Sequence, residues 1–507
     1  MLEGATAHSE PVSKITSRSG LARNTLINFL GQAIPLPVAI ITFPRIIAGL
    51  GTERFGILSV VTVFIAYFAF FDFGLGRALT TLVSEKIGAG RDHDVPGLVW
   101  TASILVGLLG ILGFAIIGLL APVFAYHALT IPNDLRGEAL KAFYWLAIGT
   151  PPVVVTSALT GILTALHRFD IINGVRIPIV LAGYVGPLLV LSFTRDVSVV
   201  VVVLVAVRML GCLVYALYTL QLLPALKHGI VFQRALLKPL LLFGGWLSVT
   251  NIAGPLMSYL DRFLIGIVVP VASLAYYTVA YDLSMKVLLI PLALATVLFP
   301  TFTMTFAQDH RRTSWIYDRS LTYSLLGLFP VVLVMVAFAR EGLTLWLGES
   351  FAMHGAVVLQ LLAIGVLLNS LAVAPFVLVQ GLGRPDLTAK LHLLELPFYL
   401  AALWWALPRW GIVGAALVWT LRVAVDLVAL CGIAQHLFPA VRAVHHRAMY
   451  GVIAAVATVA IYLMTLGPSV KVPSVAAVLV LFGVIGWFSL ARHEERAWLG
   501  RWLKRTP

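Results

Sequence analysis

Charged side chains are scarce in this sequence, and those that interrupt or border its long apolar runs are the first candidates for chemistry. The cations of this set could bind an anionic group, because arginine forms paired hydrogen bonds to phosphate or carboxylate and lysine supplies a point charge. They are Arg45, Arg77, Arg208, Arg262 and Lys286. A second set could orient those cations or take part in ion coupling. It consists of Asp72, Asp261, Asp282, Arg422 and Asp426.

Several of these charges also have a structural interpretation. Asp282 and Lys286 carry opposite charges four residues apart, as do Arg422 and Asp426, so each pair could neutralise itself on one helix face. Arg208 has no opposite charge close by in the sequence, which favours a functional role, although a carboxylate on another helix could be its partner. The sequence leaves both interpretations open for the two pairs.

Charges nearer the ends of the apolar runs can also be explained without a functional role. Asp72 stands in Asp-Phe-Gly-Leu-Gly, whose glycines allow close helix approach, so its carboxylate could cap a helix or accept a hydrogen bond between helices. Arg77 and Arg176 lie close enough to the end of an apolar run for their long side chains to reach water. A group of polar residues lies near the start of the apolar run 388–408. Its position is more typical of a charged cluster where an apolar run meets water than of a proton relay. It comprises Lys390, His392 and Glu395.

The composition excludes most soluble classes. The chain has 507 residues, of which 60% are hydrophobic and 11% charged, and its mean hydropathy is +0.98. It is too apolar for a soluble enzyme or a disordered chain, and 2 cysteines cannot form a disulfide scaffold. The net charge of +13 could suggest nucleic acid, but the basic residues are scattered in short connectors between apolar runs. That distribution indicates a membrane protein with a basic cytoplasmic face and no nucleic-acid partner.

The apolar runs predict an all-α, polytopic membrane protein. About 20 apolar residues cross the ~30 Å hydrocarbon layer, and about fourteen such segments can be delimited. The predicted spans are 25–44, 55–79, 97–120, 139–163, 171–193, 197–220, 239–268, 273–303, 318–339, 355–380, 388–408, 411–434, 448–466 and 474–491. Proline and glycine within many of them predict kinked helices, which neighbouring helices can support in a membrane.

The connectors predict the orientation of the chain. Lysine and arginine are concentrated in alternate connectors, so the positive-inside rule places both termini in the cytoplasm. Residues 1–24 are polar and precede a run of spanning length without a small-residue cleavage site, so we expect no cleaved signal.

The sequence offers no catalytic centre. No connector is long enough to form a domain, and the longest predicted outer connectors, 122–138 and 340–354, lack paired carboxylates or a Ser-His arrangement. A phosphate-binding G-x-x-x-x-G-K-[ST] motif is also missing, so ATP hydrolysis within this chain is not expected. We therefore predict a protein that is not an enzyme and needs no cofactor or metal. Transport, if that is its function, would be driven by a gradient or by consumption of the product.

The two halves of the sequence are weakly alike. Asn-Phe-Leu-Gly at 28–31 and Asn-Ile-Ala-Gly at 251–254 each precede a proline and then an arginine, at Arg45 and Arg262. Asn, Gly and Pro are common at turns and helix ends, so this likeness could also arise by chance. Taken as a repeat, it predicts two pseudo-equivalent six-helix lobes with a cavity between them and two extra helices. The predicted parts are a cytoplasmic tail 1–24, an N-lobe 25–222, a cytoplasmic connector 223–238, a C-lobe 239–436, two C-terminal helices within 437–491 and a basic tail 492–507.

Five sequence features resemble a known family. They are Pro-Arg-Ile-Ile-Ala-Gly-Leu-Gly-Thr-Glu-Arg-Phe-Gly-Ile-Leu at 44–58, Tyr67, Asp-Phe-Gly-Leu-Gly-Arg-Ala-Leu at 72–79, Leu-Asp-Arg-Phe-Leu-Ile-Gly at 260–266 and Tyr277. This pattern resembles the polysaccharide transporter family, the Wzx-type flippases, within the multidrug/oligosaccharidyl-lipid/polysaccharide exporter superfamily. The resemblance covers about the first 90 residues well and 240–305 moderately.

The resemblance implies a flippase of the bacterial inner membrane. Its substrate would be an undecaprenyl-diphosphate-linked oligosaccharide, the repeat unit of O-antigen, capsule or exopolysaccharide, moved by alternating access. Membrane lipid, a polysaccharide polymerase and a chain-length regulator would be its partners. In the superfamily the first, second, seventh and eighth spans line the cavity, which implies substrate contacts for Arg45, Arg77, Arg262 and Lys286.

Two further transport functions compete with this interpretation. A drug or cation antiporter of the multidrug and toxin extrusion type often has a carboxylate in its first span, but nothing acidic lies between Asn24 and Phe43. The deep charges are also mainly basic, which disfavours an organic cation. A lipid II flippase is the second competing function, and its first-span Arg-Asp arrangement is not evident here.

Overall fold

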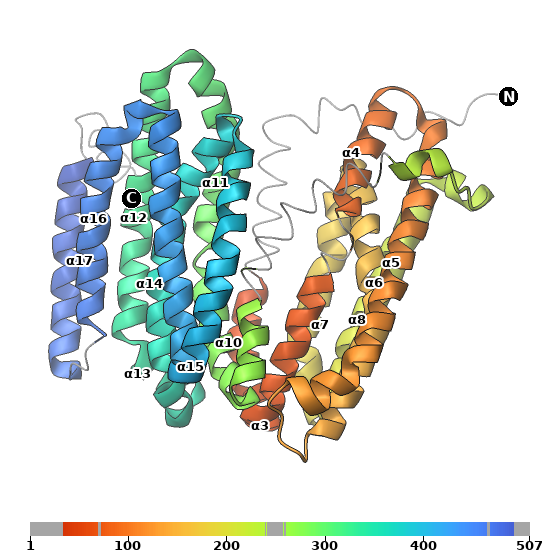
Figure 1. Ribbon diagram of the computed structural model, residues 1–507, viewed down its shortest axis with the longest axis horizontal. Coiled ribbons are helices and arrows are strands. Elements are labelled where there is room, and N and C mark those ends of the chain that lie inside the picture. Colours follow the sequence, from red (N-terminus) through yellow and green to blue (C-terminus); the bar gives the residue numbers. More distant parts are fainter. Residues whose placement is uncertain are drawn as a thin grey trace, which may run out of the picture. The chain divides into compact units, whose positions relative to one another are not determined.

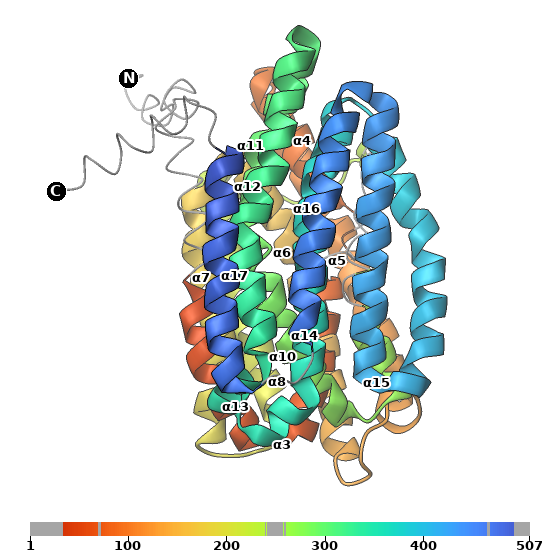
Figure 2. The same cartoon turned by 90° about the vertical axis from the view of Figure 1, so that its left-hand side faces the viewer.

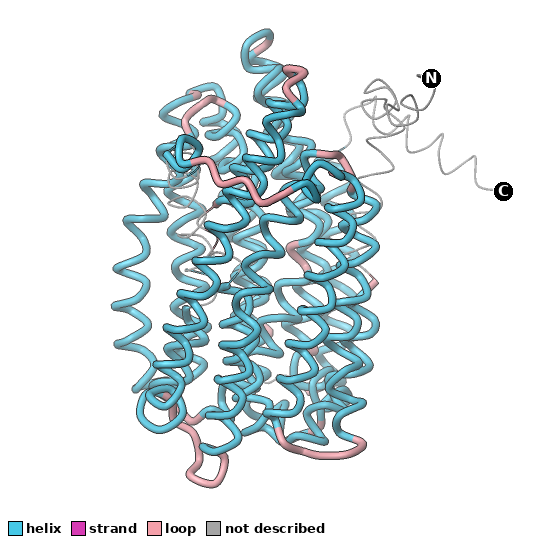
Figure 3. Tube along the Cα trace, turned by 90° about the vertical axis from the view of Figure 1, so that its right-hand side faces the viewer, coloured by secondary structure: helices cyan, strands magenta, loops and turns pink. Residues whose placement is uncertain are grey.

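The computed structural model describes residues 34–68, 72, 74–238, 240, 257, 260–463 and 467–490. Within these residues every regular element is a helix (Figure 3). Ten of the described helices are long and apolar enough to cross a membrane. The predicted all-α, polytopic membrane fold is therefore confirmed, but the number fourteen is not.

The chain divides into two compact units, Met1–Ala275 and Tyr276–Pro507. The described helices of the first unit are coloured red to yellow-green in Figure 1. They are α3 (Pro35–Phe68), α4 (Leu75–Gly88), η1 (Asp92–Asp94), α5 (Val95–Val123), the π-helical η2 (Phe124–Ala128), α6 (Arg136–Ala165), α7 (Phe169–Leu191), α8 (Val197–Leu222), η3 (Pro224–His228) and η4 (Arg234–Leu236). α6 is the centre of this unit, because α3, α4, α5, α7 and α8 all contact it.

The second unit is built around α14. Its elements are α10 (Val271–Lys286, which begins in the first unit), α11 (Leu289–Gln308), α12 (His310–Ala337), α13 (Ala339–Leu347), α14 (Glu349–Gly381), α15 (Pro385–Leu437), η5 (Pro439–Val441), α16 (Arg442–Ile461) and α17 (Pro468–Leu490). α11, α12, α13, α15 and α16 contact α14, which is also the most buried of the candidate spans. The predicted C-terminal spans 448–466 and 474–491 correspond to α16 and α17, which pack against α12.

Glycines in a left-handed conformation interrupt the two longest helices. Gly51 in α3 has a φ of 78°, and Gly411 in α15 has a φ of 54°, a conformation that is strained for other residues. In α15 the chain turns back on itself at this point, so its two halves run side by side (Figure 2). These halves correspond to the predicted spans 388–408 and 411–434.

Two predicted spans are wrong as continuous helices. The predicted span 55–79 is broken, because α3 ends at Phe68 and α4 begins at Leu75. The span 273–303 is also broken, between Lys286 and Leu289, where Pro291 cannot donate a backbone hydrogen bond to the preceding turn. Most of the predicted span 239–268, the start of span 25–44, and both predicted tails lie outside the described residues.

Candidate functional site

Asp72 lies between α3 and α4, and backbone N–H groups hold its carboxylate. Gly74 N donates a hydrogen bond to Oδ1 at 3.0 Å, and Gly76 N donates one to Oδ2 at 3.1 Å. Gly74 has a φ of 71°, which favours glycine. A Cβ at Gly161 of α6 would collide with the Gly76 carbonyl, so the capped turn also sits tightly against α6. The carboxylate thus caps α4, as the helix-capping interpretation of Asp72 predicts.

Of three further predicted cations, Arg45 and Arg77 are exposed and Arg176 is half-buried. Arg45 lies in α3 and donates a hydrogen bond to the carbonyl oxygen of Ile41 at 3.4 Å. Arg77 lies in the first turn of α4, with an exposed side chain. Arg176, in α7, donates to Asn173 Oδ1 at 2.6 Å rather than to a carboxylate.

Arg208 is half-buried in the middle of α8. Its Nη1 donates to the carbonyl oxygen of Leu204, one turn earlier, at 3.1 Å. Among the residues that the structure describes, no carboxylate forms an ion pair with it. An unpaired guanidinium at mid-membrane costs about 2.5–3.5 kcal/mol on insertion scales, so a ligand or water must compensate it.

Asp261 and Arg262 lie in a buried segment of the first unit. Arg262 N donates to Asp261 Oδ1 at 2.7 Å, and the two residues are 5% exposed or less. Thr130 anchors the segment, since its N and Oγ1 donate to the carbonyl oxygens of Gly266 and Ile267 at 3.0 Å each. The side chains of this predicted substrate contact are thus packed within protein.

Asp282 and Lys286 lie one turn apart on α10, and both are half-buried. Within the described part of the chain, no ion pair joins them, although their spacing suggested one. Asp282 has another interaction, whereas Lys286 has no described partner. The self-neutralising interpretation of this pair is therefore not what the geometry shows.

Arg422 and Asp426 belong to a buried cluster that links the two halves of α15. Arg422 Nη1 lies 3.5 Å from Glu395 Oε2, and His392 Nε2 lies 3.4 Å from Asp426 Oδ1. The Arg422 guanidinium lies over the ring of Tyr399, 5.6 Å from its centroid. The ion pairs of this cluster thus include contacts across the hairpin that the i,i+4 spacing did not predict.

The interfacial cluster predicted at 390–395 is split by the structure. Lys390 is exposed and pairs with Asp386 at 3.2 Å, which fits the prediction. His392 and Glu395 instead turn inward, and the Glu395 side chain is only 8% exposed. Sequence reasoning therefore missed Glu395 and His392 as members of a buried site. Their signal was the turn at Gly411, since residues equally distant from a hairpin turn lie opposite each other.

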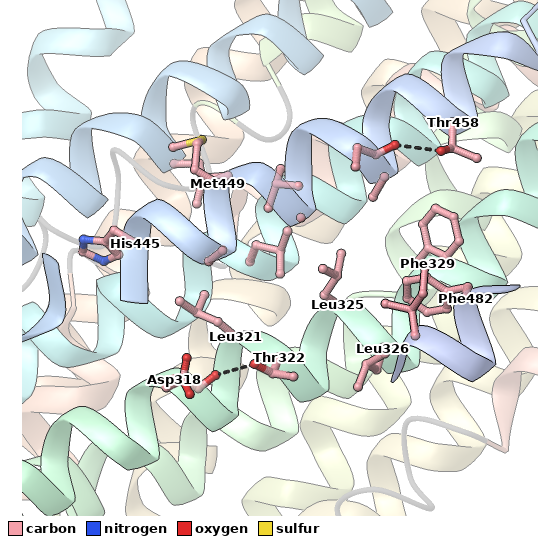
Figure 4. Close-up of a pocket in the computed structure, with 18 of the residues that line it drawn as sticks. Asp318, Leu321, Thr322, Leu325, Leu326, Phe329, His445, Met449, Thr458 and Phe482 are labelled. Carbon is pink, nitrogen blue, oxygen red and sulfur yellow. Dashed lines mark hydrogen bonds between the residues drawn. The ribbon is translucent and has the colours of Figure 1, made fainter. Parts of the chain in front are cut away.

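A mainly apolar cavity of about 460 Å³ lies between α12, α16 and α17 and was not predicted. Phe329 and Phe482 line one end of it, and Asp318 and His445 lie toward the other (Figure 4). Tyr317, buried beside it, is hydrogen-bonded to His445. The lining suits a hydrocarbon chain better than a polar head group.

Comparisons with known proteins identify the family. Residues 21–306 match the family described as polysaccharide biosynthesis protein. A Shigella flexneri protein assigned as an O-antigen transporter is 29% identical over 413 residues, which cover 81% of this chain and 96% of the relative. A Haloferax volcanii protein assigned as a low-salt glycan biosynthesis flippase is 23% identical and covers 80% of this chain and 82% of its own length.

Solved structures share the fold. The lipid II flippase MurJ, in an inward closed conformation, is similar with a TM-score of 0.70 and 13% identity, covering 93% of this chain and 100% of that one. An inward-facing multidrug resistance transporter of the MATE family has a TM-score of 0.65 and 15% identity, covering 83% of this chain and 95% of the other. With the family match over more than half of the sequence, the chain belongs to the polysaccharide biosynthesis protein family, the Wzx-type polysaccharide transporters of the multidrug/oligosaccharidyl-lipid/polysaccharide exporter superfamily.

Proposed function

We propose that this protein is a flippase that moves an undecaprenyl-diphosphate-linked oligosaccharide across the bacterial inner membrane by alternating access. The observation that carries the proposal is the similarity to an O-antigen transporter over 96% of that relative's length. The relative assigned as a glycan flippase supports the same class of lipid-linked substrate. These relatives are transporters, and transport of this kind requires no enzymatic step.

The lipid tail and the polar head group of such a substrate make different demands on the protein. Removing the polyprenyl tail from lipid would cost about 0.8 kcal/mol per CH₂, so the tail stays in the bilayer while the head group crosses. The head group carries a diphosphate and many hydroxyls, which need cations and hydrogen-bond donors in a hydrated path. Arg208 and Lys286 suit this requirement, because neither is neutralised by a described carboxylate.

We assign the substrate path to the five cations Arg45, Arg77, Arg208, Arg262 and Lys286. Arg45 and Arg77 are exposed, and Arg208 and Lys286 are half-buried. Arg262 is buried and would engage the head group after the segment around it moves. Four further charged residues orient these cations or couple transport to an ion, and they are Asp261, Asp282, Arg422 and Asp426. Asp72 acts indirectly, because it caps α4, the helix that carries Arg77.

The proposed setting follows from the same function. Both termini lie in the cytoplasm, and the chain forms two pseudo-equivalent six-helix lobes, 25–222 and 239–436, with two further helices after them. A polysaccharide polymerase and a chain-length regulator act on the flipped product. A cationic-drug antiporter is not favoured, because the deep charges outside the α15 cluster are mainly basic.

Deletion in the native host tests the proposal. Loss of the gene should abolish a surface polymer and accumulate its lipid-linked repeat unit on the cytoplasmic leaflet, measured by extraction and by leaflet-selective lectin labelling. Arg262→Lys, which keeps the charge but loses the bidentate grip, should restore less polymer than the wild-type gene. Retention of the polymer together with new sensitivity to cationic dyes would instead identify an antiporter.

A further inference from the structure

The hairpin of α15 buries more carboxylate than its arginine can neutralise. Glu395 and Asp426 are each 8% exposed at the side chain, and Arg422 approaches only one of them, Glu395, in the ion pairs of the described residues. His392 lies beside Asp426 and is charged only when protonated. With a neutral His392, two carboxylates and one guanidinium leave an uncompensated negative charge inside a membrane-spanning hairpin.

The surroundings of the two carboxylates indicate that a hydrogen-bond donor is missing. Glu395 Oε1 is buried without a hydrogen-bond partner among the described residues, and the group beside Asp426 Oδ1 is His392 Nε2 at 3.4 Å, which donates no regular hydrogen bond to it. Glu395 lies 16 residues before Gly411 and Asp426 lies 15 residues after it, so the hairpin places the two side chains at the same level of its two halves. Ionised carboxylates are acceptors only, so they cannot satisfy one another. A single proton on either would turn it into a donor to the other.

Among the described residues, α14 and η5 bring no further charge to the pair. α14 packs along α15 and has no ionisable residue between His354 and its end at Gly381, and it covers His392 with the stacked ring of Phe376. η5 contacts α15 through apolar residues.

Two more helices touch α15 farther along its second half. α10 reaches it where Tyr281 meets Trp419, and this helix carries Asp282 and Lys286. α12 approaches Cys431 through Tyr317, with Arg319 and His445 nearby. In the ion pairs found among the described residues, none of these groups is a partner of Glu395 or Asp426.

We propose that His392, Glu395, Arg422 and Asp426 form a proton-binding site, in which one exchangeable proton is held between the Glu395 and Asp426 carboxyl groups. Binding forms one O–H bond and consumes one proton from solvent. Release leaves two facing carboxylates on opposite halves of the hairpin, and their repulsion favours separation of these halves. The proton would thereby bias α15 between two arrangements and couple its movement to the proton gradient, a step that rests on the proposed flippase function.

Proton binding can be measured without any substrate. The purified full-length protein in lipid nanodiscs should show an infrared carbonyl band of a protonated carboxyl group that disappears as pH rises. Glu395→Gln and Asp426→Asn keep the shape of the side chains and should each abolish this band. The matched control is Asp386→Asn, an exposed carboxylate of the same helix that pairs with Arg384 and Lys390, and it should leave the band intact.

Three outcomes would overturn the site. The first is a wild-type protein without a titrating carboxyl band, and the second is a band that survives in both variants while thermal unfolding shows them to be folded. The third is a pH dependence of thermal unfolding that Glu395→Gln and Asp426→Asn leave unchanged and His392→Gln abolishes, which would assign the proton to His392.

Coupling is tested separately in proteoliposomes. An imposed proton gradient should change wild-type flipping by up to about tenfold per pH unit for one coupled proton. Glu395→Gln should retain flipping without a gradient but lose the response to it. If the wild type has the band but flips at a gradient-independent rate, the coupling is wrong and the proton is structural. If it has the band but flips nothing, the proposed function fails and the proton site stands.

Discussion

Deep charges have different kinds of protein partner in the two units. In the first unit, backbone groups hold them: Gly74 and Gly76 donate to Asp72, and the carbonyl oxygen of Leu204 accepts from Arg208. In the second unit, side chains meet one another across a hairpin, as Arg422 does with Glu395. A backbone partner is always present, whereas a side-chain partner can change its charge or move away. The difference predicts fixed charges in the first unit and a switchable cluster in the second.

Removing the guanidinium of the α15 cluster should have the largest effect. Arg422→Leu would leave Glu395 and Asp426 buried without their permanent cation, and breaking such a pair costs about 3–5 kcal/mol. The loss should appear as a lowered unfolding temperature in detergent. Arg384→Leu is the control, because its pair with Asp386 is exposed and is worth less than about 1 kcal/mol. Equal losses in the two variants would show that the cluster is not a tight unit.

Neutralising an unpaired cation should change transport rather than stability. Lys286→Gln and Arg208→Gln each remove a charge-assisted contact worth about 1.5–3 kcal/mol, so flipping should fall by about tenfold or more at unchanged protein level. Arg168→Gln, which removes one partner of the surface pair with Asp170, serves as the control. If Lys286→Ala instead lowers the protein level and removal of Asp282 as well restores function, the two residues form a structural pair.

The cap on α4 should contribute a smaller, purely structural amount. Asp72→Ala removes the acceptor for two backbone N–H groups and should destabilise the protein by about 1–2 kcal/mol. Asp72→Asn keeps an acceptor oxygen and should retain most of both stability and transport. Thermal unfolding and polymer complementation of the two variants check this. A folded but inactive Asp72→Asn protein would mean that the carboxylate exchanges an ion.

The smallest expected effect concerns the contact between α13 and α17. Burial disfavours the charged form of Glu341. The hydrogen bond from Lys471 at 2.6 Å, a backbone hydrogen bond and the charges of Lys471 and Arg340 together outweigh burial and hold the pKa of Glu341 below its ordinary value. A lowered pKa stabilises the fold above the unfolded value of about 4.3, and this contribution is lost as pH falls through the folded pKa. Because Glu341 is 41% exposed, Lys471→Met should cost less than about 1 kcal/mol at pH 7. An acid-unfolding midpoint that is the same in wild type and variant would contradict this assignment.

Apolar periodicity was enough to predict the membrane fold, because each span must supply its own run of hydrophobic residues. It failed where a short interruption breaks a helix within an apolar run, as around Asp72 and Gly74 and after Lys286. Proline and glycine at these places are tolerated as kinks in some membrane helices and end others. Only packing against neighbouring helices decides between the two.

Several buried charges were candidates from the sequence alone, namely Asp72, Asp261, Arg262 and Asp426. Glu395 and the partners of these charges were not identified. Spacing along one helix suggested Asp282 with Lys286, whereas the geometry leaves Lys286 without a described partner. The cluster of α15 joins residues about 30 positions apart, and its contacts follow from the register of a hairpin. The predicted spans 388–408 and 411–434 already placed a turn next to Gly411, which sets Glu395 level with Asp426, one helical turn beyond Arg422.

The most direct test of the central claim is flipping by the purified protein in vesicles that carry a fluorescent or radiolabelled undecaprenyl-diphosphate-linked oligosaccharide. Vesicles with wild-type protein should expose the head group to an added glycosidase on the opposite side, and those with Arg208→Gln or Lys286→Gln should do so at least about tenfold more slowly. Asp386→Asn should match the wild type. A wild-type protein that leaves the head group protected, while it moves a cationic dye across the same vesicles, would contradict the assignment of this chain as a lipid-linked oligosaccharide flippase.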